Sequence, residues 1–282
     1  MFRVGLIGHG IQLSRTPKMH TDEGSAHGVD YRYDLIDTKV QTGNSNIAEL
    51  LSYAENEGYC GVNVTHPYKR SVIPFLDKLS DAAKAVGAVN TIVFRDGKRF
   101  GHNTDYWGFA EAFRTGLEDV KCGRVLLIGA GGAGCAVAHA LIDRGVERLV
   151  IIDKDKASAE ELVETLVARG DGNGAIVGSS IEDELMLADG VINATPVGMS
   201  LSPGSPVPVE QLQSHLWVAD IIYFPLETEL LIAAAARGCK VMDGSGMAVF
   251  QAVRAFELFT GLRPDPNRMR ATFDAFNHKP AG

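Results

Sequence analysis

Residues 124–134 read Arg-Val-Leu-Leu-Ile-Gly-Ala-Gly-Gly-Ala-Gly, an apolar run that leads directly into a cluster of glycines. The pattern predicts a strand, a tight turn and the start of a helix. Gly129 permits the sharp turn, Gly131 lets backbone amides approach a phosphate, and Gly134 lets the helix pack against the strand. Free amides at a positive helix end bind phosphates. The segment therefore predicts a dinucleotide pyrophosphate site formed by Gly129, Ala130, Gly131, Gly132, Ala133 and Gly134, the alternative being a purely structural turn.

The acid at the end of the next apolar run indicates which dinucleotide binds. Residues 148–153 (Arg-Leu-Val-Ile-Ile-Asp) resemble a strand, and Asp153 lies 19 residues beyond Gly134, close to the roughly 20 expected for an acid that binds the adenosine ribose. A carboxylate there accepts hydrogen bonds from the ribose hydroxyls of NAD and repels the 2′-phosphate of NADP. Asp153 favours NAD. Lys154 and Lys156 keep NADP as an alternative, although both also suit a solvated turn.

Composition and charge limit the classes of function. The chain has 282 residues, a hydrophobic fraction of 45%, a net charge of −8 and a pI near 5.5, so general binding to nucleic acid or anionic membranes is not expected. No apolar run approaches the roughly 18 residues that span a bilayer, and no cleavable signal pattern precedes the first strand. We therefore expect a cytoplasmic protein. The four cysteines have neither zinc nor disulfide spacing, and Cys135 is expected to be either a packing residue or a reactive thiol at a helix start.

Alternating apolar patterns predict an α/β protein with two domains. The first domain is expected over residues 1–104, joined by helices within 245–282, and a Rossmann-type, doubly wound parallel sheet is expected over 105–244. The strands expected in the first domain are 3–7, 31–37, 61–64, 91–95 and 99–102. Those expected in the second are 124–128, 148–153, 190–193, 217–220 and 240–242. Thr16 before Pro17 is expected to be an N-cap, and helices are expected over 47–54, 105–115, 247–260 and 266–276.

Four short stretches carry polar residues beyond what turns require. They are Leu-Ser-Arg-Thr-Pro at 13–17, Asn-Val-Thr-His-Pro-Tyr-Lys at 63–69, Gly-Ala-Val-Asn-Thr at 87–91 and Gly-His-Asn-Thr-Asp at 101–105. Three of them lie at or beyond the ends of expected strands, where open α/β sheets bind ligands. Their hydroxyls, amides, ammonium and carboxylate suit a small polyhydroxylated acid. Taken singly, these residues could instead be helix caps and turn formers.

The same stretches resemble the shikimate dehydrogenase family over essentially the whole chain. Further matches are the glycine turn, Asn-Ala-Thr-Pro-x-Gly-Met at 193–199 and Gly-Met-x-x-x-Gln at 246–251. The resemblance implies a substrate domain joined to a Rossmann domain, an active site in the cleft between them, and oxidation of a ring hydroxyl of a cyclic carboxylate. Ser14 and Thr16 would then bind the substrate carboxylate, and Lys69 with Asp105 would be the catalytic pair.

The resemblance implies roles for further residues. The ring hydroxyls would be bound by Asn63, Thr65, Asn90, Asp105 and Gln251, and the nicotinamide half of the cofactor would lie along Asn193, Thr195, Met199 and Gly246. Removing a hydride from a carbinol carbon requires a base for the hydroxyl proton, a role that suits Lys69. Attraction of the substrate carboxylate is the alternative role for Lys69, and His66 is an alternative base. Tyr223 matches a tyrosine near the substrate, and a core aromatic is the other interpretation.

Two departures from the common family pattern favour one branch of the family. Thr16 stands where biosynthetic members usually have serine, and Asp153-Lys154 stands where an Asn-Arg-Thr stretch usually holds the NADP phosphate. Both resemble the NAD-dependent quinate/shikimate dehydrogenase branch. We therefore expect quinate and shikimate as substrates and NAD as cofactor, in a monomer or homodimer that needs no metal. The alternatives are an NADP-dependent biosynthetic shikimate dehydrogenase and a non-catalytic sensor of the cofactor or the acid.

Overall fold

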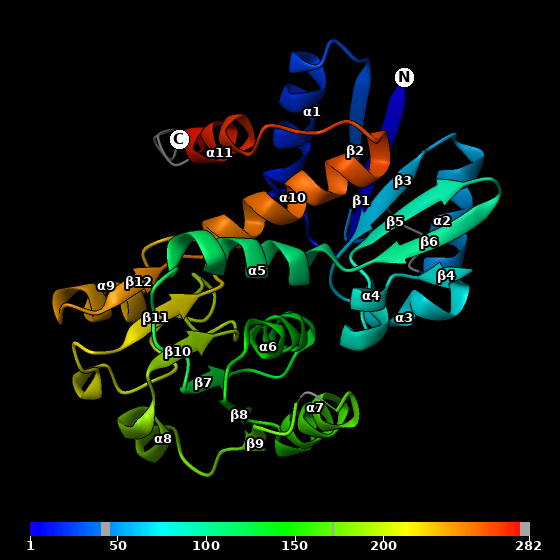
Figure 1. Ribbon diagram of the computed structural model, residues 1–282. Helices are drawn as coiled ribbons and strands as arrows, with labels where there is room; N and C mark the ends of the chain where they lie inside the picture. Colours follow the sequence, from blue (N-terminus) through cyan, green and yellow to red (C-terminus); the bar gives the residue numbers. More distant parts are fainter. Residues whose placement is uncertain (41–45, 171, 277–282) are drawn as a thin grey trace. The chain divides into compact units, whose positions relative to one another are not determined.

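The computed structural model describes residues 1–40, 46–170 and 172–276. The chain divides into two compact units (Figure 1). Unit 1 comprises Met1–Thr104 and Val249–Gly282, and unit 2 comprises Asp105–Ala248. The second boundary falls inside α10 (Ser245–Thr260), a little beyond residue 245, where the sequence analysis placed it. Within the described ranges no helix combines the length and apolar character needed to cross a membrane.

Unit 1 is built on a mixed six-stranded sheet in the order β2-β1-β3-β5-β6-β4. β1 pairs in parallel with β2 and β3, whereas β5 runs antiparallel to β3 and β6. The Asp96-Gly97 turn joins β5 to β6, and both residues have positive φ, as a two-residue hairpin turn requires. The strands are β1 (Phe2–Gly8), β2 (Tyr31–Asp37), β3 (Gly61–Val64), β4 (Lys78–Leu79), β5 (Thr91–Arg95) and β6 (Lys98–His102).

Helices from both ends of the chain complete unit 1. α1 packs against β2 and α11, and a buried carboxylate ties the two helices together: Glu23 accepts hydrogen bonds from Arg268 Nε at 2.7 Å and from the Asp265 amide at 2.8 Å. The helix α11 is therefore part of the core of this unit, with Met269 and Phe273 buried. The helices are α1 (Thr16–Ala26), α2 (Ile47–Asn56), α3 (Tyr68–Ser71), α4 (Asp81–Val86), α11 (Pro266–Ala275), most of α10, and the 3₁₀ turn η1 (Ile73–Phe75).

Unit 2 is built on a wholly parallel six-stranded sheet in the order β12-β11-β10-β7-β8-β9. This is the doubly wound order, in which successive strands run outward in both directions from β7, so that the switch point lies between β7 and β10. Ligands of such sheets bind beyond the carboxyl ends of the strands at that point. The strands are β7 (Arg124–Ile128), β8 (Arg148–Ile152), β9 (Ala175–Val177), β10 (Gly190–Asn193), β11 (Trp217–Asp220) and β12 (Lys240–Met242).

The helices of unit 2 flank this sheet. α6 contacts β7 and β8, α7 contacts β8 and β9, and α9 contacts β11 and β12 (Figure 1). The central strands are buried on both faces, which explains their unbroken apolar sequence. The helices are α5 (Thr104–Gly116), α6 (Gly132–Arg144), α7 (Lys156–Ala168), α8 (Ile181–Leu187) and α9 (Glu229–Ala236), with the 3₁₀ turn η2 (Val209–Gln211).

The two-domain α/β prediction is confirmed, including all ten expected strands. The sequence analysis missed β4 and β9, which are two and three residues long and too short to show a period of their own. The expected N-cap at Thr16 is wrong: α1 starts at Thr16 itself, and the N-cap is Arg15, whose side chain makes no capping hydrogen bond. Pro17 nonetheless lies in the first turn, where its missing N–H costs nothing.

Candidate active site

The glycine turn at the carboxyl end of β7 has the predicted backbone geometry. Gly129 has φ of +105°, and a Cβ there would lie 2.7 Å from the Ala194 carbonyl oxygen. At Gly134 a Cβ would lie 2.1 Å from the Gly129 carbonyl oxygen, so α6 can approach β7 only with glycine at this position. Gly131 is the N-cap of α6, and a Cβ there would meet nothing within 4 Å. Packing requires glycine at positions 129 and 134, whereas Gly131 borders open space.

Asp153 directly follows β8 and is hydrogen-bonded to the glycine turn. Its carboxylate accepts a hydrogen bond from the Ala130 amide at 2.7 Å and another from the Asp155 amide at 2.9 Å. Lys156 forms an ion pair with Glu160, one turn along α7, at 3.1 Å, which agrees with the solvated-turn interpretation of that lysine. Asp153 thus holds the glycine turn through the Ala130 amide. It also lies at the position where an acid that binds the adenosine ribose is expected.

The other strand at the switch point, β10, ends in a turn stabilised by its own last residue. Asn193 Oδ1 accepts hydrogen bonds from the Thr195 amide at 2.9 Å and the Thr195 hydroxyl at 2.7 Å, and its Nδ2 donates to the Val197 carbonyl oxygen at 2.9 Å. The Ala194 amide donates to the last residue of β7, Ile128. These bonds hold residues 193–197 beside the glycine turn, which leaves small side chains next to Gly129.

Met199 and Tyr223 both lie on the surface of unit 2. Their exposed fractions are 42% and 45%, and the exposure of Tyr223 argues against the core-aromatic interpretation. Gly246 has a packing role, because a Cβ there would lie 2.9 Å from the Ala112 Cβ of α5. Cys135 is buried, and its thiol donates to the Ala130 carbonyl oxygen at 3.5 Å. It is therefore a packing residue.

A buried carboxylate at the end of β11 supports this region, and the sequence analysis missed it. Asp220 is 0% exposed and accepts hydrogen bonds from Asn193 Nδ2 at 3.2 Å, from the Ile222 amide at 3.0 Å and from the Thr228 hydroxyl at 2.8 Å. Burial raises its pKa to about 6, although these three donors favour the charged form. An acid at the end of an apolar strand was the signal used for Asp153, and it would also have found Asp220.

Asp220→Asn is expected to alter the pH dependence of stability. The pKa of Asp220 is higher in the folded protein, at about 6, than in the unfolded chain, at about 3.9. The stabilising effect of its protonation is therefore complete below about pH 4 and is lost as the pH rises through about 6. Relative to the Asn variant, the free energy of unfolding of the wild type should fall by on the order of 3 kcal/mol between pH 4 and 7. Thermal melts of both proteins across this range measure it, and a constant difference in Tm would contradict it.

In unit 1, the side chains of Asn63 and Asn90 use most of their donors and acceptors in hydrogen bonds to other groups of the protein. Asn63 Oδ1 accepts from the Tyr33 hydroxyl at 2.8 Å, and its Nδ2 donates to the Asn90 carbonyl oxygen and to the Thr91 hydroxyl. Asn90 Oδ1 accepts from the Thr104 amide at 2.7 Å, and its Nδ2 donates to the Thr104 hydroxyl. Both residues are buried. This network joins the ends of β3 and β5 to the start of α5.

These hydrogen bonds leave each of the two amides one further hydrogen-bonding position. An amide side chain offers two acceptor lone pairs and two N–H donors. Among the contacts of the described residues, Asn63 retains one acceptor lone pair and Asn90 one N–H. A ligand hydroxyl could therefore donate to Asn63 and accept from Asn90.

Thr65 and Lys69 follow β3, and Thr65 lies close to the end of β1. A Cβ at Gly8 would lie 2.4 Å from the Thr65 Cγ2, so the two turns meet closely, and the His9 amide donates to the His66 carbonyl oxygen. Lys69 lies in α3, and its carbonyl oxygen accepts from the Val89 amide at 2.8 Å. The backbone thus brings the stretches 63–69 and 87–91 together at one end of the sheet.

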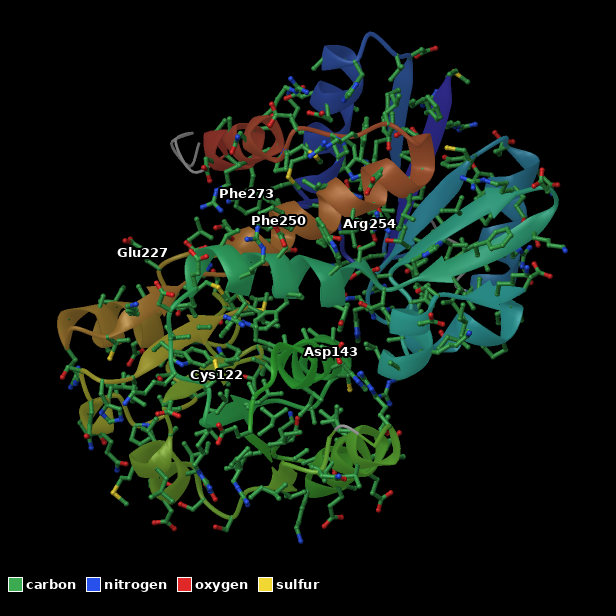
Figure 2. All side chains as sticks on the ribbon, viewed as in Figure 1. Cys122, Asp143, Glu227, Phe250, Arg254 and Phe273 are labelled. Atoms are coloured by element: carbon green, nitrogen blue, oxygen red, sulfur yellow. The ribbon has the colours of Figure 1, made fainter. Side chains whose placement is uncertain are left out.

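The segment Ser14-Arg15-Thr16 is held at the start of α1 by its central residue. Phe273 belongs to α11 (Figure 2). The buried Arg15 guanidinium lies 4.5 Å from the centroid of the Phe273 ring and donates to the Phe273 carbonyl oxygen at 3.3 Å. The Thr16 amide donates to the Ser14 hydroxyl at 3.4 Å. Arg15 thereby anchors the two hydroxyl residues to the C-terminal helix of the same unit.

Asp105 and Gln251 come from two further helices. Asp105 lies in the first turn of α5, which starts one residue earlier at Thr104, so the cap interpretation of Asp105 is wrong. Gln251 lies in α10 and is half-buried. Over residues 1–40, 46–170 and 172–276, no group of three or more His, Cys, Asp or Glu side chains is arranged to hold a metal ion.

Three family models match successive parts of the chain. Residues 6–92 match the shikimate dehydrogenase substrate-binding domain, and residues 244–272 match the shikimate 5′-dehydrogenase C-terminal domain. Residues 104–240 match the ThiF family. The two shikimate dehydrogenase models thus lie on either side of the segment that carries the parallel sheet.

Relatives over the whole length give the same family. A quinate/shikimate dehydrogenase (NAD⁺) of Corynebacterium efficiens is 47% identical over 96% of both chains. A shikimate dehydrogenase (NADP⁺) of Streptomyces avermitilis is 48% identical over 96% of this chain and 94% of its own. The structure of a quinate dehydrogenase from Corynebacterium glutamicum in complex with NAD superposes with a TM-score of 0.94, at 45% identity over 97% of this chain and 99% of that one. At these identities over nearly the full length, the chain belongs to the shikimate dehydrogenase family.

Proposed function

We propose that the chain is an NAD-dependent dehydrogenase that oxidises one ring hydroxyl of quinate and of shikimate, giving 3-dehydroquinate and 3-dehydroshikimate. We further propose that it acts in the cytoplasm as a monomer or homodimer. The observation that carries the choice of NAD is Asp153, a carboxylate at the end of β8 that is hydrogen-bonded to the glycine turn. The relative from Corynebacterium efficiens and the structural neighbour are both described with NAD.

The glycine turn fits a dinucleotide. Open space at Gly131 and the amides at the start of α6 suit a pyrophosphate, and Asp153 would accept the ribose hydroxyls. Asn193, Thr195, Met199 and Gly246 would border the nicotinamide half, and Lys154 lies on the surface nearby. When bound, NAD supplies the hydride acceptor.

The polar residues of unit 1 suit the substrate. Ser14 and Thr16 would bind the carboxylate through their hydroxyls, while Asn63 and Asn90 have the acceptor lone pair and N–H needed for ring hydroxyls. The remaining contacts would come from Thr65, Gln251 and Tyr223. A rigid amide network of this kind distinguishes a ring hydroxyl from hydrogen, because an unmet buried partner costs about 1–3 kcal/mol.

Lys69 and Asp105 would carry the proton chemistry. As the hydride leaves the carbinol carbon, the Lys69 amine in its unprotonated form would accept the hydroxyl proton, so that a neutral ketone forms. Asp105 would accept a hydrogen bond from the resulting ammonium and so orient it beside the substrate oxygen. The methyl group that distinguishes Thr16 from serine would reshape the carboxylate end, where quinate carries its additional hydroxyl.

Initial rates in a two-by-two design test the proposal: quinate or shikimate, with NAD⁺ or NADP⁺, at mildly alkaline pH. Turnover of both acids with NAD⁺ is expected. The second candidate is an NADP-dependent shikimate dehydrogenase, which the 48% identical relative from Streptomyces avermitilis favours. Turnover of shikimate alone, and only with NADP⁺, would establish that candidate. Binding of either ligand without turnover would instead indicate a sensor.

The Gly131→Ala and Gly134→Ala variants are expected to separate cofactor binding from folding. At Gly131 a methyl has room and φ is −72°, so Tm should stay within about 2 °C while KM for NAD rises about tenfold or more through contact with the pyrophosphate. At Gly134 the methyl would collide with the Gly129 carbonyl, so Tm itself should fall. Melting curves and NAD titrations measure both effects, and a Gly131→Ala protein with unaltered KM would rule out pyrophosphate binding at this turn.

A further inference from the structure

Asp37, the last residue of β2, is an almost fully buried carboxylate with four hydrogen-bond donors. Its Oδ1 accepts from the Gly10 amide at 2.8 Å and from the Lys39 amide at 3.0 Å. Its Oδ2 accepts from the Ile11 amide at 3.0 Å and from Gln12 Nε2 at 2.9 Å. Only 2% of the residue is exposed. Three of the four donors belong to residues 10–12, which lie 25 to 27 positions away in the sequence.

The segment that Asp37 holds leads into the residues expected to bind the substrate carboxylate. The Ser14 amide donates to the Ile11 carbonyl oxygen at 3.0 Å, so the peptide units on both sides of Ile11 are fixed, one by Asp37 and one by Ser14. Beyond Ser14, Arg15 is anchored on Phe273. Residues 10–16 are thus fastened at both ends, to β2 by Asp37 and to α11 by Arg15.

The negative charge of Asp37 is stabilised by these four donors. The hydrogen bonds from Gln12 and from the Lys39, Gly10 and Ile11 amides lower its pKa to about 2, in spite of burial. Asp37 is therefore ionised at neutral pH, and only an ionised carboxylate can accept from all four donors with both oxygens. Asn has the same shape but a single acceptor oxygen, and its NH₂ group would face two of the donors.

We propose that Asp37 is a positioning residue for the substrate carboxylate: it fixes the loop Gly10–Gln12 and, through Ile11, sets the place of the Ser14 hydroxyl. The inference rests on the proposed function, because it takes Ser14 and Thr16 as the residues that bind the carboxylate of quinate or shikimate. Because Asp37 is almost fully buried beneath this loop, it would not touch the substrate itself. Its effect should therefore appear in the KM of the acid and not in the KM of NAD or in kcat.

The first test compares Asp37→Asn with a matched control on the same strand. Asp34 is another β2 carboxylate with a lowered pKa, less buried than Asp37, and its partners are Arg3, Arg32 and Tyr59 rather than the loop. Asp37→Asn should raise KM for quinate about tenfold or more, with kcat and KM for NAD changing by less than about twofold. Asp34→Asn should leave KM for quinate, kcat and KM for NAD within about twofold of wild type. An Asp37→Asn enzyme with unchanged KM for quinate would overturn the inference.

Gln12→Ala is a milder variant, and we expect it to fold as the wild type does because Gln12 is exposed. Gln12 is exposed and supplies one of the four donors, so KM for quinate should rise in the same direction by a smaller factor, about two- to fivefold. Amide hydrogen exchange gives a readout that needs no activity: Gly10, Ile11 and Ser14 should exchange faster in Asp37→Asn than in wild type. Unchanged protection of these amides would count against the proposed restraint.

A double-mutant cycle with Ser14→Ala tests whether Asp37 acts through Ser14. If it does, Asp37→Asn should raise KM for quinate by less than about threefold in the Ser14→Ala background, because the positioned hydroxyl is already gone. Equal effects in both backgrounds would overturn the route through Ser14. Failure of the proposed function is recognised separately, since the wild type would then show no turnover of quinate or shikimate with NAD⁺ before any variant is compared.

Discussion

Lys69→Ala is expected to lower kcat for quinate oxidation by about two to four orders of magnitude, with a change in KM of less than about tenfold. The reason is that the hydroxyl proton would have no acceptor while the hydride departs, although the substrate would still be held by Ser14, Thr16 and the amide network. Steady-state rates with quinate and with NAD⁺ varied separately measure kcat and both KM values.

Arg70→Ala is the matched control for this prediction. Arg70 is the next residue of α3 and is an exposed cation, so its loss reports the general effect of removing a positive charge from this helix. We expect kcat within about twofold of wild type. If Lys69→Ala raised KM for the acid strongly and left kcat unchanged, Lys69 would attract the carboxylate rather than accept the proton. His66→Ala then becomes the variant to compare.

Asp153→Asn is expected to reduce the preference for NAD over NADP, expressed as the ratio of kcat/KM values, by about 10- to 100-fold. A hydrogen bond from a ribose hydroxyl to a charged acceptor contributes about 1.5–3 kcal/mol, and removal of the charge also removes the repulsion of the 2′-phosphate. Asn is preferable to Ala because the Ala130 amide at 2.7 Å still needs an acceptor. With Ala, loss of the glycine turn would be confused with loss of ribose recognition.

Asp155→Asn tests whether any nearby acid has this effect. Asp155 lies two residues further on, is exposed, and accepts a hydrogen bond from the Ser158 hydroxyl at 2.7 Å. We expect its cofactor ratio to stay within about threefold of wild type, since a screened surface charge has a small effect. If Asp153→Asn and wild type had the same ratio of kcat/KM for NAD over NADP, Asp153 would stabilise the glycine turn without recognising the ribose.

The glycine turn and the parallel sheet of unit 2 were predicted well because their signals are local. Four apolar residues followed by Gly129, Gly131 and Gly134 determine a strand, a turn and a helix within a short stretch, and all five expected strands of this unit are present. The structure adds a reason for two of the glycines, since a Cβ at 129 or 134 would collide with a carbonyl group. The strand β9 has three residues and forms because β8 offers it an edge, which no periodicity reveals.

The polar residues of unit 1 mark the limit of what the sequence could predict. It offered two interpretations of Asn63 and Asn90, turn formers or substrate ligands. The structure shows that both amides are buried in a network with Tyr33, Thr91 and Thr104. The sequence analysis gave Tyr33 no role because its effect comes through Asn63, 30 positions away. Hydrogen-bond partners of this kind are set by which strands become neighbours.

By itself the sequence determined the fold class, the two α/β domains, the dinucleotide turn and the family, because apolar periodicity, glycine spacing and ordered motifs are properties of neighbouring residues. Only the tertiary structure decided which acids support the site. Asp37, Asp153 and Asp220 each follow or end a strand, yet Asp37 binds the loop Gly10–Gln12, Asp153 binds the glycine turn and Asp220 binds Asn193. The sequence places all three at strand ends, but a carboxylate acquires its donors only when distant segments pack and exclude water from it.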